Sequence, residues 1–332
     1  SEQSLQTVNV LAEKRDKKIR KVEMSTNNIE MKTIQKLPSL MGEVDVIKSI
    51  QMLPGVQNGG EGTTGFFVRG GSADQNLILL DEAAVYNASH LGGFLSVFNS
   101  DVVKSVKLYK GGIPAGYGGR LSSLLDIRMK EGNINEFKGR GGIGILSSRL
   151  TLEAPIINER SSFIVAGRRT YADLFFPLSS NEMAKNSTAY FYDLNMKANY
   201  RFNEKNRIYV SGYFGRDIVG FSDMMGMEYG NGTFTLRYNH LFSDRIFSNT
   251  TLIYCDFDYG MEISEGPIDF KWKSGITTKQ LKHDYTYYLN PQNTVKFGIS
   301  AIHHTFEPGN ISSNDTMSII SSVKLPQVQA LE

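Results

Sequence analysis

Two short segments have the spacing of known chemical sites. Residues 139–144 match the GxGxxG pattern, which binds dinucleotide phosphates when a helix begins directly after it. Residues 146–154 instead alternate apolar and polar side chains, which is the period of a β-strand. His303 and His304 are adjacent, and adjacent side chains of a strand point to opposite faces, so the two cannot readily bind one ion. We therefore expect no cofactor and no metal at either segment.

Composition excludes several other classes of function. No nucleophile–base pair, phosphate loop or pair of carboxylates stands out, so we do not expect an enzyme. The 36 basic and 34 acidic residues nearly balance, which gives no electrostatic case for nucleic acid. A single cysteine, Cys255, rules out an intramolecular disulfide framework. No segment has the ~20 apolar residues of a membrane helix, and no signal peptide is evident at Ser1.

From about residue 137 onward the sequence has period 2. The segment 190–202 is the clearest case, with aromatic and aliphatic residues on one face and Asp, Asn, Lys and Arg on the other. It is longer than a typical soluble strand of ~5–6 residues. Short turns alternate with longer connections, expected near 172–189, 217–232, 260–276 and 308–323, and aromatic residues lie at both ends of segment 190–202. Both features are typical of a membrane β-barrel. The alternative is a large soluble β-sandwich, which also alternates, but long strands count against it.

The first 130 residues follow a different pattern. Residues 1–36 are polar and basic, as in a solvated linker. Residues 37–130 alternate short apolar runs with glycine-rich turns, and residues 43–53 have helical spacing. We expect a small α/β domain here, followed by antiparallel barrel strands, which makes the chain mainly β.

Four motifs in order carry a resemblance to a known family. They are Leu53–Val56 (LPGV), Val68–Gly71 (VRGG), Leu79–Asp81 (LLD) and Lys110–Arg120 (KGGIPAGYGGR). This series resembles the plug domain of TonB-dependent outer-membrane receptors, particularly those of Bacteroidetes. The stretch Thr7, Val8, Asn9 and Val10 resembles a TonB box. One departure is Glu82, which follows Asp81 where the family usually has glycine.

The resemblance implies a division of the chain and a mechanism. Residues 1–36 would be the TonB box and linker, 37–130 the plug, and 131–332 the first eight or nine of 22 barrel strands. The implied activity is TonB-dependent import across the outer membrane of a Gram-negative bacterium, with TonB, ExbB and ExbD as partners. Iron chelates, cobalamin, peptides and glycans all stay open as substrates, and a surface lipoprotein is a further candidate partner. The alternatives are a non-transporting surface receptor or adhesin and a passive porin, which a plug disfavours.

The resemblance also implies site residues. Arginines between plug glycines are expected to pair with plug or wall acids and hold the plug in place, either as a releasable latch or as a static folding contact. The candidate latch residues are Arg69, Arg120, Asp81 and Glu43. The expected plug turns contain Gly55, Gly70, Gly71, Gly111, Gly112, Gly118 and Gly119. Tyr86, Asn87 and His90 are expected to contact substrate, from an outward-facing plug loop, and the alternative for His90 is a hydrogen-bonding role within the loop.

Overall fold

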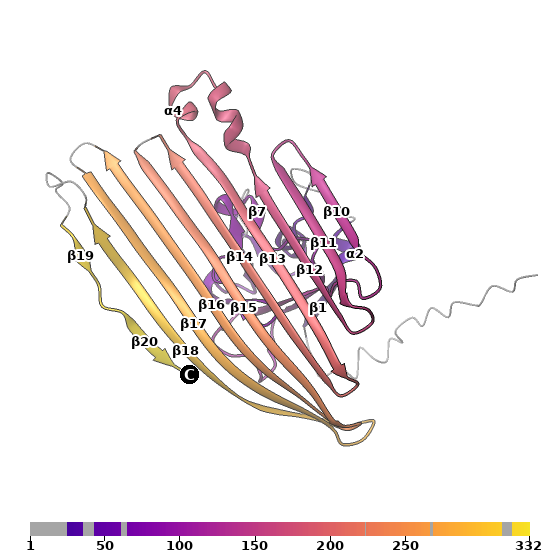
Figure 1. Ribbon diagram of the computed structural model, residues 1–332. Helices are drawn as coiled ribbons and strands as arrows, with labels where there is room; N and C mark the ends of the chain where they lie inside the picture. The colour runs from indigo at the N-terminus through magenta and orange to yellow at the C-terminus, as the bar shows by residue number, and fades with distance from the viewer. Residues whose placement is uncertain (1–24, 36–42, 61–64, 223, 266–267, 314–320) are drawn as a thin grey trace, which may run out of the picture.

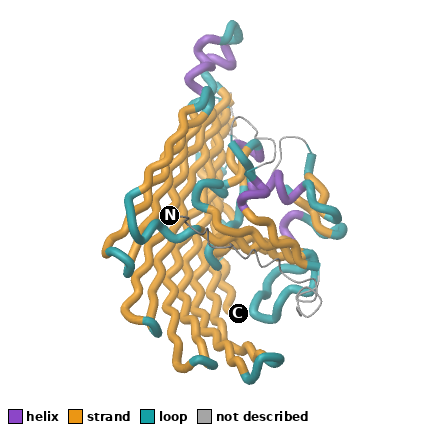
Figure 2. Tube along the Cα trace, turned by 90° about the vertical axis from the view of Figure 1, so that its right-hand side faces the viewer, coloured by secondary structure: helices purple, strands orange, loops and turns teal. Residues whose placement is uncertain are grey.

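Two sheets of unequal size make up the protein. The structure, a computed structural model, describes residues 25–35, 43–60, 65–222, 224–265, 268–313 and 321–332 (Figure 1). A five-stranded and an 11-stranded sheet account for most of the strands. Figure 2 shows the large sheet as a curved wall, with the small sheet and its helices against the concave side. The prediction of a mainly β chain with a small α/β unit is confirmed.

The small unit, here called the plug region (residues 25–130), is a mixed sheet with short helices. Its elements are β1 (Thr26–Glu30), α2 (Met31–Ile34), α3 (Val46–Gln51), β2 (Val56–Asn58), β3 (Phe66–Val68), η1 (Ala73–Gln75), β4 (Asn76–Leu80), β5 (Ala83–Ala84), β6 (Ser89–His90), η2 (Leu91–Gly93), β7 (Leu95–Ser96), β8 (Val103–Tyr109) and β9 (Ser123–Met129). The sheet order is β1-β8-β9-β4-β5, with β4 and β9 parallel. The Asp45 side chain caps α3 by accepting from Lys48 N at 2.9 Å, which satisfies one of the free amides at the helix start. The apolar face of α3 is then buried in the core of this region.

Strand β1 is a difference from the sequence-based expectation. It lies inside the segment expected to be a linker, yet it pairs with β8 along its whole length, for example Ile29 opposite Val106. The five residues TNNIE carry no alternating pattern of apolar and polar side chains. They form a strand because they pair with the edge of a sheet that distant residues build, and local sequence does not report this. The plug sheet therefore begins at Thr26.

The large sheet, here called the wall, is built from consecutive antiparallel strands. They are β10 (Lys138–Ile143), β11 (Ser147–Ile157), β12 (Ser161–Thr170), β13 (Thr188–Asn203), β14 (Asn206–Phe221), β15 (Met225–Ser243), β16 (Ile246–Glu265), β17 (Ile268–Tyr288), β18 (Thr294–Ser312), β19 (Val323–Lys324) and β20 (Val328–Leu331). Each strand from β10 to β18 pairs with its neighbours in sequence, and β19 and β20 both pair with β18. Residues 217–232 and 260–276 were expected to be long connections, but they are mostly strand.

The two faces of the wall have inverted polarity. On β13 the polar residues Asp193, Asn195 and Lys197 are buried, whereas Leu194 and Met196 are 36% and 43% exposed. A soluble sheet would bury its apolar face. The polar face contacts the plug region, so the apolar face is left to point outward, as a lipid-facing barrel surface requires.

The outward apolar band ends at a row of charges. Arg216 on β14 shares the outward face with Phe214, two residues away, and its guanidinium lies 2.5 Å from Asp258 and 3.2 Å from Glu228. In the register of the wall, Arg216 stands opposite Tyr192. Because lipid-facing charges are unfavourable within the hydrocarbon, we take this level as the outer limit of the membrane core.

One connection projects far beyond the strands. It contains η3 (Ala172–Leu178) and α4 (Glu182–Lys185) and rises above β12 and β13 at the top of Figure 1. The opposite ends of the strands are joined by short turns, such as Asn203 to Asn206. Membrane barrels have short periplasmic turns and longer outer loops, so this connection marks the outer end. None of the helices in the described residues is long and apolar enough to cross a membrane.

Candidate functional site: the interface between plug region and wall

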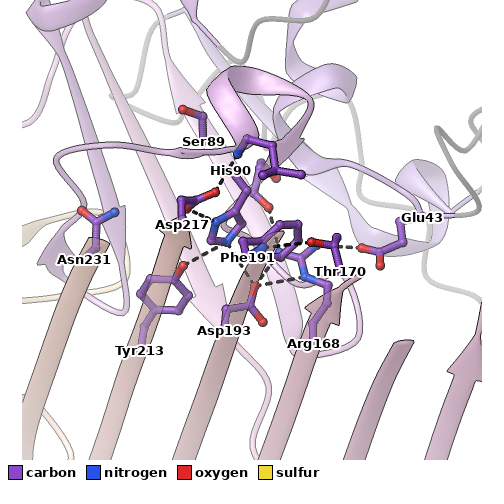
Figure 3. Close-up of polar contacts among 12 residues, drawn as sticks. Glu43, Ser89, His90, Arg168, Thr170, Phe191, Asp193, Tyr213, Asp217 and Asn231 are labelled. Atoms are coloured by element: carbon purple, nitrogen blue, oxygen red, sulfur yellow. Dashed lines mark hydrogen bonds and ion pairs between the residues drawn. The ribbon is translucent and has the colours of Figure 1, made fainter. Parts of the chain in front are cut away.

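An arginine of the wall joins the plug region to two strands. Arg168 on β12 is 5% exposed and donates from Nη1 to Glu43 Oε2 at 2.7 Å and from Nη2 to the Ser96 carbonyl at 2.9 Å. Its Nε and Nη2 also donate to Asp193 Oδ2 of β13, at 3.0 and 2.6 Å. Figure 3 shows the guanidinium between Glu43 and Asp193. One side chain therefore links the plug region to the wall and is balanced by a carboxylate from each.

His90, at the outer side of the plug region, is held by two wall carboxylates. Its Nδ1 lies 2.6 Å from Asp217 Oδ2 and its Nε2 lies 3.3 Å from Asp193 Oδ2. The ring stacks on Phe191 with centroids 3.9 Å apart (Figure 3). Burial alone lowers the pKa of His90, but the hydrogen bonds to Asp193 and Asp217 outweigh it, so the pKa is raised above its ordinary value. The charged imidazolium is thus favoured between the two acids.

The same loop makes further contacts with the wall. The Leu91 amide donates to Asp217 Oδ1 at 2.7 Å, and the Gly92 amide donates to the Tyr229 hydroxyl at 2.9 Å. Asn231 Nδ2 donates to the Asn87 carbonyl at 2.7 Å. Tyr86 shares a short hydrogen bond with Thr278 of β17. The three residues expected to contact substrate, Tyr86, Asn87 and His90, are therefore brought together in one loop. The Tyr86 and His90 side chains and the Asn87 backbone contact the wall, and the Asn87 side chain accepts from Ser89.

The turn between β4 and β5 forms a second link to the wall. Asp81 and Glu82 both have left-handed φ values, 47° and 78°, which is the geometry of a turn that favours glycine at its second position. Asp81 Oδ2 lies 2.8 Å from Lys197 Nζ of β13. Glu82 Oε1 lies 2.8 Å from Arg128 within the plug region and 2.9 Å from Arg237 of β15.

Glu82 thus replaces glycine with a side chain that reaches the wall. Burial raises the pKa of Glu82, but Arg128 and Arg237 outweigh it, and the pKa is lowered. The carboxylate is therefore charged at neutral pH. With Glu82 in place of the family's glycine, the turn keeps its left-handed geometry and gains an ion pair. The left-handed backbone of a non-glycine residue costs roughly 1 kcal/mol.

The two candidate arginines of the plug region have other surroundings. Arg69 and Arg120 are exposed. Arg69 Nη2 donates to Ser25 Oγ at 2.8 Å, and Arg120 Nη1 donates to the Gly119 carbonyl at 2.8 Å. Neither forms an ion pair with any residue that the structure describes. Instead, Glu43 and Asp81 pair with wall cations. In these two pairs the plug region supplies the acid and the wall the base, whereas at His90 the wall supplies the acids.

The remaining candidates divide between described and undescribed parts. Left-handed φ values occur at Gly55, Gly70, Gly112 and Gly119, and a Cβ at Gly71 would lie 2.5 Å from Ser122 Oγ. Thr7, Val8, Asn9 and Val10 lie outside the described residues. Within the described residues, no group of three or more His, Cys, Asp or Glu side chains could hold a metal ion.

Comparison with known proteins agrees with this architecture. Residues 18–122 match the family described as TonB-dependent Receptor Plug Domain. No curated protein matches the chain. The copper transporter OprC superposes with a TM-score of 0.68 at 14% identity, over 92% of this chain and 50% of its own.

Two further solved structures show the same fold. A ferric enterobactin receptor mutant from Pseudomonas aeruginosa superposes with a TM-score of 0.64 at 16% identity, over 87% of this chain and 50% of its own. The siderophore receptor PirA from Acinetobacter baumannii gives 0.64 at 16% identity, over 86% and 48%. At these identities the likeness concerns the fold, and the chain spans about half the length of each structure. Residues 18–122 are thus a TonB-dependent receptor plug domain, and the chain as a whole has the fold of the plug and part of the barrel of these outer-membrane proteins.

Proposed function

We propose that the protein imports a scarce substrate across the outer membrane, using force that TonB, energised by ExbB and ExbD, applies to residues 7–10. The observation that carries the proposal is the set of buried ion pairs between plug region and wall. A plug held in the lumen prevents passive flow, so a porin function is disfavoured. No enzymatic step is part of the proposal.

The nature of these contacts supports a latch that opens and closes again. Apolar packing across the interface involves Ile164, Ala166 and Tyr213 of the wall, whereas Arg168, Lys197 and Arg237 provide charged contacts. Buried ion pairs contribute little net stability compared with apolar packing, because desolvation offsets their attraction. They nevertheless require a specific geometry. Such an interface defines the closed position without making it irreversible.

The proposed division of the chain follows from the same contacts. Residues 1–36 would carry the TonB box and end in the first plug strand, residues 37–130 would complete the plug, and residues 131–332 would form the first barrel strands. The family match begins at residue 18, which supports a plug that includes β1.

The test uses the full-length receptor in cells with and without TonB. Ser96 is fully buried at the interface, so a Ser96→Cys variant, with Cys255→Ser as background, reports plug displacement through labelling by a water-soluble maleimide. We expect labelling only in cells that have TonB. Ser180→Cys, in the exposed outer connection, is the matched control and should be labelled in both strains.

The outcomes separate import from its alternative. Labelling of Ser96→Cys that is the same in both strains would contradict TonB-driven movement. Protection in both strains, even with a bound ligand, would favour the non-transporting surface receptor or adhesin.

A further inference from the structure

An apolar pocket lies at the outer end of the wall. Its volume is about 320 Å³, within the range of small-molecule sites. Phe176, Met183 and Ala184 line it from the projecting connection, and Ala189, Val219 and Phe221 line it from β13 and β14. None of its lining residues is charged.

The polar groups beside the pocket are used within α4. Asn181 Oδ1 accepts from the Met183 and Ala184 amides, at 2.9 and 3.4 Å. Ser187 Oγ donates to the Met183 carbonyl at 2.7 Å. These two oxygen atoms are thus engaged within the connection, and most of the lining is apolar. A polar or charged guest would lose its hydration without compensation, whereas an apolar one would gain by burial.

The apolar side chains that the strands contribute to the pocket, Ala189, Val219 and Phe221, belong to the lumen face of the wall. Ala189 and Val219 are paired in the register and lie two residues along their strands from Phe191 and Asp217, which contact His90. Side chains two apart share a face of a strand, at a spacing of ~7 Å. The pocket is therefore directly outside the loop of the plug region that carries His90.

Lipid cannot account for this apolar surface. Val219 lies three residues beyond Arg216, where the outward charges mark the limit of the membrane core. Val219 and Phe221 of the lining are on the opposite face of β14 from those charges, because each differs from Arg216 by an odd number of positions. Met183 and Phe221 nevertheless remain 55% and 49% exposed. This apolar surface is at the entrance to the lumen, outside the membrane core and above the plug region. A molecule that enters the lumen from outside therefore passes it.

We propose that this pocket binds an uncharged apolar group of the imported molecule, of the size of one or two aromatic rings or a short acyl chain. A cavity of ~150 Å³ holds one benzene ring, so the pocket has room for such a group. This inference rests on the proposed import function and narrows its substrate class to molecules that carry an uncharged apolar group, and it disfavours an unmodified glycan.

The test measures binding of a probe to the full-length receptor held in amphipol. Fluoroindole is uncharged and aromatic, and fluorine NMR follows its binding. We expect it to bind the wild-type protein and to bind Met183→Glu about tenfold more weakly or worse, because a carboxylate enters the apolar site. Leu178→Glu is the matched control: Leu178 is 81% exposed in the same connection and does not line the pocket, so affinity should be unchanged. Fluoroglucose, a polar ring of similar size, should not bind.

The outcomes of this experiment either support or overturn the pocket. Equal weakening by both substitutions, or none by Met183→Glu, would overturn the proposal, as would absence of binding to the wild type, since another segment of the receptor would then fill the pocket. The labelling of Ser96→Cys in cells tests import separately. TonB-dependent labelling together with fluoroindole binding that ignores Met183→Glu would reject the pocket alone, and the opposite pattern would reject import alone.

Discussion

Replacing Arg168 by methionine should loosen the plug region from the wall. The substitution keeps much of the side-chain volume but removes the donors to Glu43, Ser96 and Asp193. Glu43 is then left buried without its cation, and Asp193 keeps only His90. Breaking a buried ion pair on one side costs about 3–5 kcal/mol. At 1.4 kcal/mol per factor of ten, the displaced population should rise roughly 100- to 4,000-fold.

The assay is the rate of maleimide labelling of Ser96→Cys in the purified full-length receptor, without TonB. When closing is faster than labelling, this rate follows the displaced population. Arg169→Met is the control, because Arg169 is the next residue on β12, is exposed on the other face and stacks on Tyr190 at 5.3 Å. An Arg168→Met protein that labels at the rate of its parent would refute the assignment of Arg168 as the link.

Three other outcomes are expected. Leu194→Arg should reduce folding stability in lipid, by less than the ~2–4 kcal/mol of a midplane arginine because Leu194 lies two residues from the level of Tyr192, measured by urea titration in bilayers; an unchanged midpoint would argue against a lipid-facing position. Val8→Pro should abolish TonB-dependent labelling of the interface reporter while Val8→Ala is mild, because proline removes a backbone donor from an added strand; normal labelling of the proline variant would exclude this TonB box. The pKa of His90 is raised on folding, so its stabilising contribution is complete below the unfolded pKa of ~6.5 and is lost as pH rises through the folded pKa; urea midpoints against pH should show this loss, and His90→Gln should lack it.

The sequence predicted strands well where lipid imposes one apolar face. The segment expected at 190–202 is β13, Thr188–Asn203. Alternation is weaker in β12, because Phe163 and Val165 face outward while Ile164 and Ala166 meet the apolar core of the plug region. With apolar residues on both faces, period 2 disappears. The outer parts of β14 to β17 were expected to be loops because they lie beyond the lipid and need no apolar alternation.

The candidate site was only partly within reach of the sequence. Glu43 and Asp81 were identified as acids of the plug region, but their partners, Arg168 and Lys197, lie more than a hundred residues away in the chain. Many wall residues of suitable charge face the lumen, and one sequence does not say which of them meets a given acid. Arg69 and Arg120 were chosen as latch candidates because glycines lie next to them in the sequence. Their exposure depends on tertiary structure, which local spacing does not report.

The burial of the latch has a consequence for how the protein responds to its surroundings. The side chains of Arg168 and Glu43 are 4% and 8% exposed, and those of Lys197 and Asp81 are 5% and 4% exposed. Dissolved ions screen charges across water, over ~10 Å at 0.1 M salt, and have little access to pairs enclosed by protein. The pair of Arg216 and Asp258 on the outer surface is 22% and 46% exposed and should weaken as salinity rises. A bacterium moving between fresh and saline water would thus keep its plug equally closed, while the ionic contacts around the mouth relaxed or tightened with the medium.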